Sequence, residues 1–271
     1  MKFFKRILIE NKVNIYHASY ASFLNHGIPV RVALQYCSEV YTCDLSNNYL
    51  KKQCSKTDYS HTSNHQKYRT TFASLVNKNI LLGRAQDVLE KLFSGTIVKH
   101  IIYMKESPFH SRKSNISDVD GVVFLHDFFD SISHFLNRPF IDYYEWTYFT
   151  LKLIRELNLN FAVKPHPNQR LGSQQLIEKL KREFCDIQWI DSSVSNKVIF
   201  SKIKYGISFH GSVLPELAYH NIIPIAVGDN FCEAYDFVFT ARTKQEYRNL
   251  ILNRKDLKLG KDTREQVKEF Y

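Results

Sequence analysis

Residues 205–216 read Tyr-Gly-Ile-Ser-Phe-His-Gly-Ser-Val-Leu-Pro-Glu, and this stretch decides the fold class. Its first half, Tyr205 to Phe209, suits a buried strand, and its second half predicts a helix that begins near Ser212. The same change from strand to helix recurs along the chain from Gly121 onward. Strands that alternate with helices predict a parallel, doubly wound α/β sheet, and such sheets bind ligands at the carboxyl ends of their strands.

The rest of the chain divides into a regular part and a weaker one. After Gly121 we predict strands over residues 121–126, 160–164, 187–190, 205–209 and 222–227, and a short apolar segment at 237–239. The predicted helices cover 143–157, 173–184, 194–200, 212–219 and 244–252. Before Gly121 the pattern predicts a helix over 16–25, a strand over 28–34 and a helix over 84–93. A polar stretch at 105–120 places the domain boundary, so we expect an N-terminal domain at 1–118 and a C-terminal domain at 119–271.

The composition indicates a folded protein with anionic partners. Of 271 residues, 44% are hydrophobic and 14% aromatic, which excludes collagen-like and low-complexity classes. The 37 Lys and Arg residues against 27 Asp and Glu give a net charge of +10, which favours phosphates, acidic glycans or an anionic membrane surface. The basic residues are scattered and form no stripe interleaved with aromatics, so we expect no nucleic-acid partner.

Targeting and redox signals indicate a cytoplasmic protein. The apolar run at the N-terminus is cut by Glu10 and Lys12, so it is too short for a signal peptide or a membrane span. The five cysteines are odd in number and contain no CxxC pair, so they predict neither a disulfide framework nor a zinc ribbon. A reducing compartment fits this pattern best.

Three loops place polar side chains directly after an apolar strand. The first offers His126, Asp127 and Asp130, which could supply a base, orient an acceptor or hold a cation; the alternative is an ordinary capped helix start. The second, Lys164-Pro-His-Pro-Asn168, is stiffened by two prolines. The third is the stretch from Ser208 to Glu216. In a parallel sheet all three open at one edge, so their side chains could converge on a single ligand.

The second and third loops suit a phosphate. The prolines hold the imidazole of His166 in a defined direction beside Lys164, although a stiff turn with an incidental histidine is the alternative. Gly211 lets the backbone approach a ligand, and we expect Ser212 to cap the following helix, whose amino end favours an anion. Glu216, one turn into the helix, could accept hydrogen bonds from sugar hydroxyls such as those of ribose. The alternative is a common Gly-Ser helix start with a solvated glutamate.

Several familiar motifs are absent from the sequence. It contains no GxxxxGK[ST], GxGxxG, HExxH or GxSxG pattern. Their absence argues against P-loop nucleotide hydrolysis, the usual dinucleotide oxidoreductases, zincins and typical α/β-hydrolases. We therefore expect no cofactor and no resident metal.

In this order and spacing, the loops resemble bacterial capsule polysaccharide biosynthesis proteins, the family that includes Kdo transferases. The residues that carry the resemblance are His126-Asp127, Asp130-Ser131, Asp142-Tyr-Tyr-Glu-Trp146, Lys164-Pro-His-Pro-Asn168 and Phe209-His-Gly-Ser-Val-Leu-Pro-Glu-Leu-Ala218. The resemblance covers residues 121–271 and extends weakly to 17–44. It implies a glycosyltransferase-B-like fold with two Rossmann-type domains. The part before Gly121 is short for a full domain, so we expect the N-terminal one to be reduced or truncated.

The resemblance also implies roles for the loop residues. Carried over by position, the donor nucleotide would be bound by Lys164, His166, Asn168, His210, Gly211, Ser212 and Glu216, with Glu216 on the ribose. The catalytic candidates are His126, Asp127 and Asp130, and Glu39 is a further candidate for the base. The nucleotide-sugar donor is a substrate, and the acceptor would be a glycan or glycolipid.

The function that the resemblance implies is transfer of a sugar from CMP-Kdo or a UDP-sugar to a growing capsule or lipopolysaccharide glycan. Two alternatives remain open. One is a teichoic-acid-type transferase that moves a polyol phosphate from a CDP-activated donor, and the other is a non-catalytic glycan- or nucleotide-binding module. An acceptor carried on a lipid would bring the protein into peripheral contact with the inner membrane.

Overall fold

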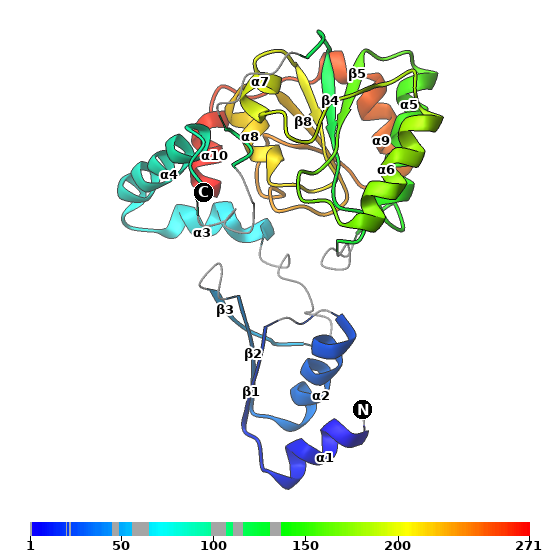
Figure 1. The fold of residues 1–271 in the computed structure, drawn as a ribbon. Helices are drawn as coiled ribbons and strands as arrows, with labels where there is room; N and C mark the ends of the chain where they lie inside the picture. The colour runs from blue at the N-terminus through cyan, green and yellow to red at the C-terminus, as the bar shows by residue number, and fades with distance from the viewer. Residues whose placement is uncertain are drawn as a thin grey trace. The chain divides into compact units, whose positions relative to one another are not determined.

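The computed structural model describes residues 2–19, 21, 23–44, 49–55, 65–98, 107–110, 116–130 and 137–271. The described residues form two compact units (Figure 1). The first lies within residues 1–64, and the second begins at His65 and contains the C-terminus. None of the helices in the described part of the chain is both long enough and apolar enough to cross a bilayer.

The first unit is a small sheet with two helices packed on it. Its strands are β1 (Ile15–Ala18), β2 (Glu39–Asp44) and β3 (Tyr49–Lys52), with β1 parallel and β3 antiparallel to the central β2. The helices are α1 (Lys2–Glu10) and α2 (Ile28–Tyr36), and a π-helical turn at Phe23–Gly27 precedes α2. Leu8, Val30, Ala33 and Val40 form the centre of its core.

The predictions for this unit were wrong at two elements. The stretch predicted to begin a helix at Tyr16 is strand β1, and the stretch predicted as a strand at 28–34 is helix α2. Pro29 lies in the first turn of α2, where its missing N–H costs nothing, and Val30 and Ala33 are buried on one helical face. β1 forms because it pairs with β2, a contact that overrides local propensity.

The second unit is built on a six-stranded, all-parallel sheet with the strand order β6-β5-β4-β7-β8-β9. The strands are β4 (Gly121–Phe124), β5 (Phe161–Lys164), β6 (Gln188–Trp189), β7 (Tyr205–Ile207), β8 (Ile223–Val227) and β9 (Phe239–Ala241). From β4 the chain adds β5 and then β6 on one side. It then returns to the other side of β4, where it adds β7, β8 and β9. The predicted parallel, doubly wound sheet is confirmed.

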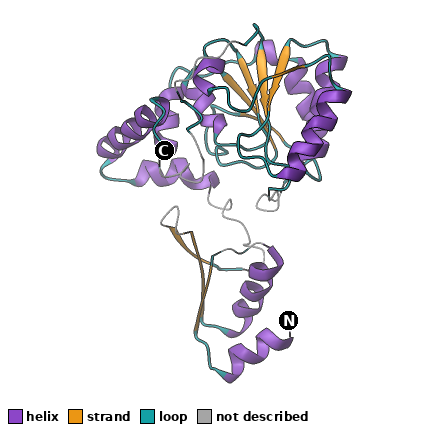
Figure 2. Ribbon diagram, in the orientation of Figure 1, coloured by secondary structure: helices purple, strands orange, loops and turns teal. Residues whose placement is uncertain are grey.

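Helices cover both faces of this sheet, as Figures 1 and 2 show. One face carries α5 (Tyr143–Glu156), α6 (Leu171–Glu183) and α9 (Lys244–Leu252), and the other carries α7 (Asn196–Phe200) and α8 (Val213–Tyr219). The side chains of β4 alternate: Val123 packs in the first core, and Val122 and Phe124 pack in the second. Burial on both faces explains why the strands are continuous apolar runs.

Three helices join the second unit outside the layers of the sheet. They are α3 (Tyr68–Ser74), α4 (Lys78–Phe93) and α10 (Thr263–Phe270), and a 3-10 turn at Arg254–Asp256 precedes α10. The α10 helix packs against α3, α4 and α8, and an ion pair of 2.8 Å joins Arg69 to Asp236. The compact unit therefore begins at His65, whereas the sequence placed the domain boundary at residue 118.

Candidate functional site

The three loops with polar side chains follow β4, β5 and β7, which are neighbours in the sheet. Because every strand of the sheet is parallel, the loops open at the same edge. β4 lies between β5 and β7, at the point where the strand order reverses. This is the switch point at which doubly wound sheets bind their ligands.

Two histidines and a tyrosine form a tight cluster at the switch point. The ring of His126 stacks on that of Tyr143, with centroids 4.6 Å apart and an interplanar angle of 12°. The ring of His210 lies 4.7 Å from that of His126. The hydroxyl of Tyr143 is 2.9 Å from Nε2 of His210, which is a buried hydrogen bond. Helix α5 thus fixes the direction of both imidazoles.

His126 is neutral at physiological pH. Its pKa falls to about 3 because burial disfavours the cation, and the nearby His166 lowers it further. Nε2 of His126 lies 3.3 Å from Oγ of Ser208 and 3.5 Å from the backbone nitrogen of His210. So weak a base is poorly suited to remove a proton from an acceptor. The geometry favours His126 as a group that orients its neighbours; the predicted catalytic role stays a prediction.

Gly211 and Ser212 bring the third loop close to this cluster. A Cβ at Gly211 would lie 2.9 Å from Oγ of Ser208, so any larger residue there would force the Ser208 hydroxyl to move. The predicted capping bond from Ser212 is wrong: its side chain is exposed and caps no amide. Its backbone is helical, at φ −58° and ψ −16°, whereas a capping side chain requires an extended backbone.

His166 presents a neutral N–H donor. The backbone N–H of Asn168 donates to its Nδ1 at 3.1 Å, so the proton of the neutral ring lies on Nε2. Burial lowers the pKa of His166 below 6.5, although the charges of Asp130 and Asp127 oppose the shift. At pH 7 the ring is therefore uncharged and carries a directed donor.

Lys164 and Glu216 lie in a buried cluster that Asn196 bridges. The ammonium of Lys164 donates to Oδ1 of Asn196 at 2.7 Å, and the side chain of Asn196 also hydrogen bonds to Glu216. Burial lowers the pKa of Lys164 to about 8, an effect that the charge of Glu216 opposes. Burial likewise raises the pKa of Glu216 to about 8, against the effects of Lys164 and Asn196. Because both side chains are buried, their predicted contacts with phosphate and ribose stay predictions.

The acidic candidates differ sharply in their surroundings. Asp127 is buried, and its two oxygens accept the backbone N–H groups of Phe129 at 2.9 Å and Arg170 at 2.6 Å. It therefore ties the first loop to the start of α6. Asp130 is exposed and close enough to His166 to favour its cation. Glu39, in the first unit, accepts a hydrogen bond from Lys52 at 2.7 Å.

Sequence reasoning assigned no role to Tyr143 or Asn196, although Tyr143 lies in a segment that carries the resemblance. Tyr143 and Asn196 are the first residues of α5 and α7, and only the folded sheet brings them to the loops. Asp142, which caps α5 by accepting the N–H of Glu145 at 2.7 Å, was the one local signal that fixes where Tyr143 lies. Ser131, which the resemblance included, lies outside the described residues. The described residues contain no group of three or more His, Cys, Asp or Glu side chains arranged to hold a metal ion.

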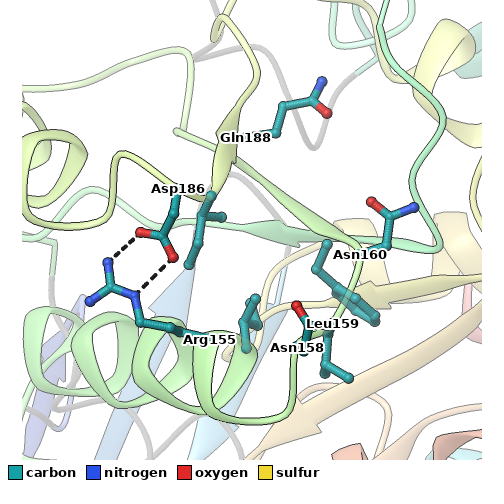
Figure 3. A pocket seen from close by; sticks show the side chains of 9 residues that line it. Arg155, Asn158, Leu159, Asn160, Asp186 and Gln188 are labelled. Atoms are coloured by element: carbon teal, nitrogen blue, oxygen red, sulfur yellow. Dashed lines mark hydrogen bonds and ion pairs between the residues drawn. The ribbon is translucent and has the colours of Figure 1, made fainter.

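A pocket of about 250 Å³ lies at the opposite end of the strands (Figure 3). Its lining includes Asn160 and Phe161, where β5 begins, and Gln188, where β6 begins. Arg155 and Asp186, which also line it, are bonded to each other. Because the pocket is remote from the three loops and its charged groups are paired, we place the candidate site at the carboxyl ends instead.

Comparison with known proteins supports the fold. No protein-family model matches the sequence, and no curated protein sequence matches it. Among solved structures, the chain is similar to KpsC of Thermosulfurimonas dismutans, a β-Kdo 2,7-transferase, with a TM-score of 0.54 and 18% identity. The match covers 99% of this chain and 79% of KpsC. At this identity the likeness shows a shared fold.

Proposed function

We propose that this protein is a glycosyltransferase that takes a sugar from a nucleotide-activated donor, CMP-Kdo or a UDP-sugar, and adds it to a bacterial capsule or lipopolysaccharide glycan. The observation that carries the proposal is the convergence of His126, His166, His210 and Gly211 at the switch point of a doubly wound sheet. The fold shared with KpsC, itself a transferase, supports the same class of reaction.

His166 is the residue to which we assign stabilisation of the leaving nucleotide. Negative charge grows on the phosphate as the glycosidic bond breaks, so a fixed N–H donor stabilises the transition state more than the bound donor. The Nε2–H of His166 has this character, because Asn168 and the flanking prolines hold the ring. A neutral donor also needs no change of protonation during the reaction.

The buried cluster of Lys164, Asn196 and Glu216 anchors the loop that follows β5 and carries His166. Lys164 ends β5 and lies two residues before His166, so its bond to Asn196 anchors the strand end from which that ring projects. Its positive charge, even where it is buried, favours an anion at this edge of the sheet. We therefore assign the cluster to positioning and electrostatic support.

Asp130 is the carboxylate to which we assign the activation of the acceptor. Of the two aspartates in the first loop, it is the exposed one, and Asp127 already accepts two backbone N–H groups. A general base must reach the acceptor hydroxyl, which an exposed carboxylate can do and a buried one cannot. Replacement of Asp130 by Asn should therefore abolish transfer while donor binding persists.

The test is a donor-turnover assay with CMP-Kdo, UDP-glucose and CDP-glycerol. We expect turnover of one of the first two, and a loss of about 10²-fold in His166→Ala. His166→Gln, which keeps a neutral N–H donor, should recover part of the rate; no recovery would contradict the role as a neutral donor. Turnover of CDP-glycerol alone would support the polyol-phosphate transferase. Binding without any turnover would support a non-catalytic module.

The α1 helix favours a lipid-linked acceptor. Its exposed side chains include the basic Lys2, Lys5 and Arg6 together with Phe3, which is 70% exposed. A basic helix with exposed apolar side chains suits the surface of an anionic membrane. We expect the protein to float with vesicles that contain anionic lipid but not with neutral ones, and Lys5→Glu with Arg6→Glu to remain in solution.

A further inference from the structure

Phe231 is an exposed aromatic ring beside the candidate site. It lies in the loop after β8, the strand next to β7, and it is 38% exposed. Its ring meets that of His210 edge to face, at 6.3 Å and 82°. Behind it lies the buried ring of His65, whose centroid is 5.0 Å away. The ring is therefore braced against both histidines and keeps part of its surface open.

The backbone that carries Phe231 is held firmly. Gly228 has a φ of +72°, and a Cβ there would lie 2.5 Å from the carbonyl oxygen of Asn137, so only glycine fits. The N–H of Asp229 donates to that same carbonyl at 2.9 Å. Asn230 is fully buried and joins the loop to Thr240 through a bond of 2.9 Å. The loop thus presents its aromatic ring in a fixed position, which lowers the entropy cost of binding.

The polar side chains of this loop are already engaged. The carboxylate of Asp229 accepts bonds from Asn137 and from Arg242, the latter at 2.6 Å. Asn230 accepts the N–H of residue 232 at 2.9 Å. Glu233 accepts a bond from Arg242 at 3.0 Å. A ligand that lies on Phe231 therefore gains an apolar contact and no hydrogen-bond readout from these side chains.

We propose that Phe231 is the platform for the sugar ring of the donor; this inference rests on the proposed function. One face of a pyranose carries C–H groups that pack on an aromatic ring, while its hydroxyls point elsewhere. The bond that breaks joins the sugar to the phosphate, so the sugar must lie next to the phosphate-binding loops. Phe231 lies next to those loops, because its ring meets that of His210 in the loop after β7.

The topology places the sugar and the nucleoside on opposite sides of the phosphate. Along the carboxyl edge of the sheet, Asn196 follows β6, Lys164 ends β5, His126 follows β4, His210 follows β7 and Phe231 follows β8. A phosphate at the central histidines leaves Phe231 on the β8 side. The sugar then lies over β8, and the nucleoside extends toward β5 and β6.

The experiment compares the nucleotide alone with the nucleotide sugar. Binding of CMP and CMP-Kdo, and of UDP and UDP-glucose, is measured calorimetrically on the full chain for the wild type, Phe231→Leu and Phe231→Tyr. We expect Phe231→Leu to weaken binding of the productive sugar nucleotide about 5- to 10-fold and to leave binding of its free nucleotide within about twofold. Phe231→Tyr, which keeps an aromatic face, should bind both as the wild type does.

The outcomes separate the two proposals. Equal weakening of the nucleotide and the sugar nucleotide would overturn the inference in favour of a nucleobase platform. Unchanged binding of both would overturn it in favour of a purely structural ring. A wild-type protein that binds none of the four compounds would overturn the proposed function and, with it, this inference. Thermal melts of both variants verify that folding is intact, and the Tyr variant preserves the aromatic packing on His65.

Discussion

Replacement of Glu216 by Gln tests the buried cluster through its dependence on pH. Glu216 is 2% exposed, and burial raises the pKa of its carboxyl from 4.5 to about 8. Gln keeps the size of the side chain and its bond to Asn196, but it cannot ionise. The variant therefore isolates the free energy of placing a charge at this position, with little change in packing.

The expected magnitude follows from linkage between protonation and folding. Because the pKa of Glu216 is higher in the folded state, the stability tied to its protonated form is complete below about pH 4.5 and is lost as the pH rises toward 8. Each pH unit within that span is worth about 1.4 kcal/mol, so between pH 5 and 7.5 the wild type should lose about 3 kcal/mol through this group. Glu216→Gln has no carboxyl to titrate, so it does not lose this stability. The difference in unfolding free energy between the variant and the wild type should therefore rise by about 3 kcal/mol from pH 5 to pH 7.5. Lys164 adds to this rise. Without the charge of Glu216 the pKa of Lys164 in the folded state falls further, so the variant gains stability as the pH rises and Lys164 loses its proton.

The assay is urea unfolding at pH 5, 6, 7 and 7.5, followed by tryptophan fluorescence. Both tryptophans, Trp146 and Trp189, lie in the second unit, so the signal reports the unit that contains the cluster. Glu178→Gln, an exposed site on α6, is the matched control and should differ from the wild type by the same amount at every pH. A difference between Glu216→Gln and the wild type that stays constant within about 0.5 kcal/mol would refute the reasoning.

Three further substitutions test the packing of the second unit. Tyr143→Phe removes the hydroxyl that bonds to His210, so it should cost about 1 kcal/mol of stability and lower kcat/KM about tenfold; unchanged kinetics would separate this bond from function. Gly206→Ala places a Cβ 2.3 Å from Cδ1 of the buried Leu217, so urea unfolding should show a loss of about 1–3 kcal/mol, and a neutral result would mean that the leucine moves freely. Gly83→Ala, in α4 with open space around it, should raise stability by about 0.5–1 kcal/mol in the same assay; a loss would indicate an unseen contact.

Most of the second unit could be predicted because its signals are local. β4 and β5 are buried on both faces, so each reads as a continuous apolar run. Thr243 caps the helix over 244–252, because its side chain accepts the N–H of Glu246. The predicted bounds of this helix match the observed ones. The first unit gave weaker signals, because β1 is short and depends on pairing with β2, which the sequence around Tyr16 does not show.

That the three loops meet at one edge of the sheet could be predicted, but the hydrogen bonds among their side chains could not. Loops after neighbouring parallel strands must meet at one edge, so His126, His166 and His210 follow from topology. The bond from Lys164 to Asn196 joins residues 32 positions apart, and nothing near either residue predicts it. Successive side chains of a strand point to opposite faces of the sheet. Whether Lys164 meets solvent or the core therefore depends on the exact residue at which β5 ends.

The neutral state of His126 and His166 bears on how the protein would respond to ionic strength. In the proposed function both imidazoles would act through bond dipoles, and Lys164 is shielded from the solvent by burial. Dissolved ions screen exposed net charge far more than short, buried, directed dipoles. The surplus of ten positive charges on the chain should therefore govern how fast an anion arrives, and added salt should slow that arrival. The lifetime of the bound anion, once it is seated, should change little.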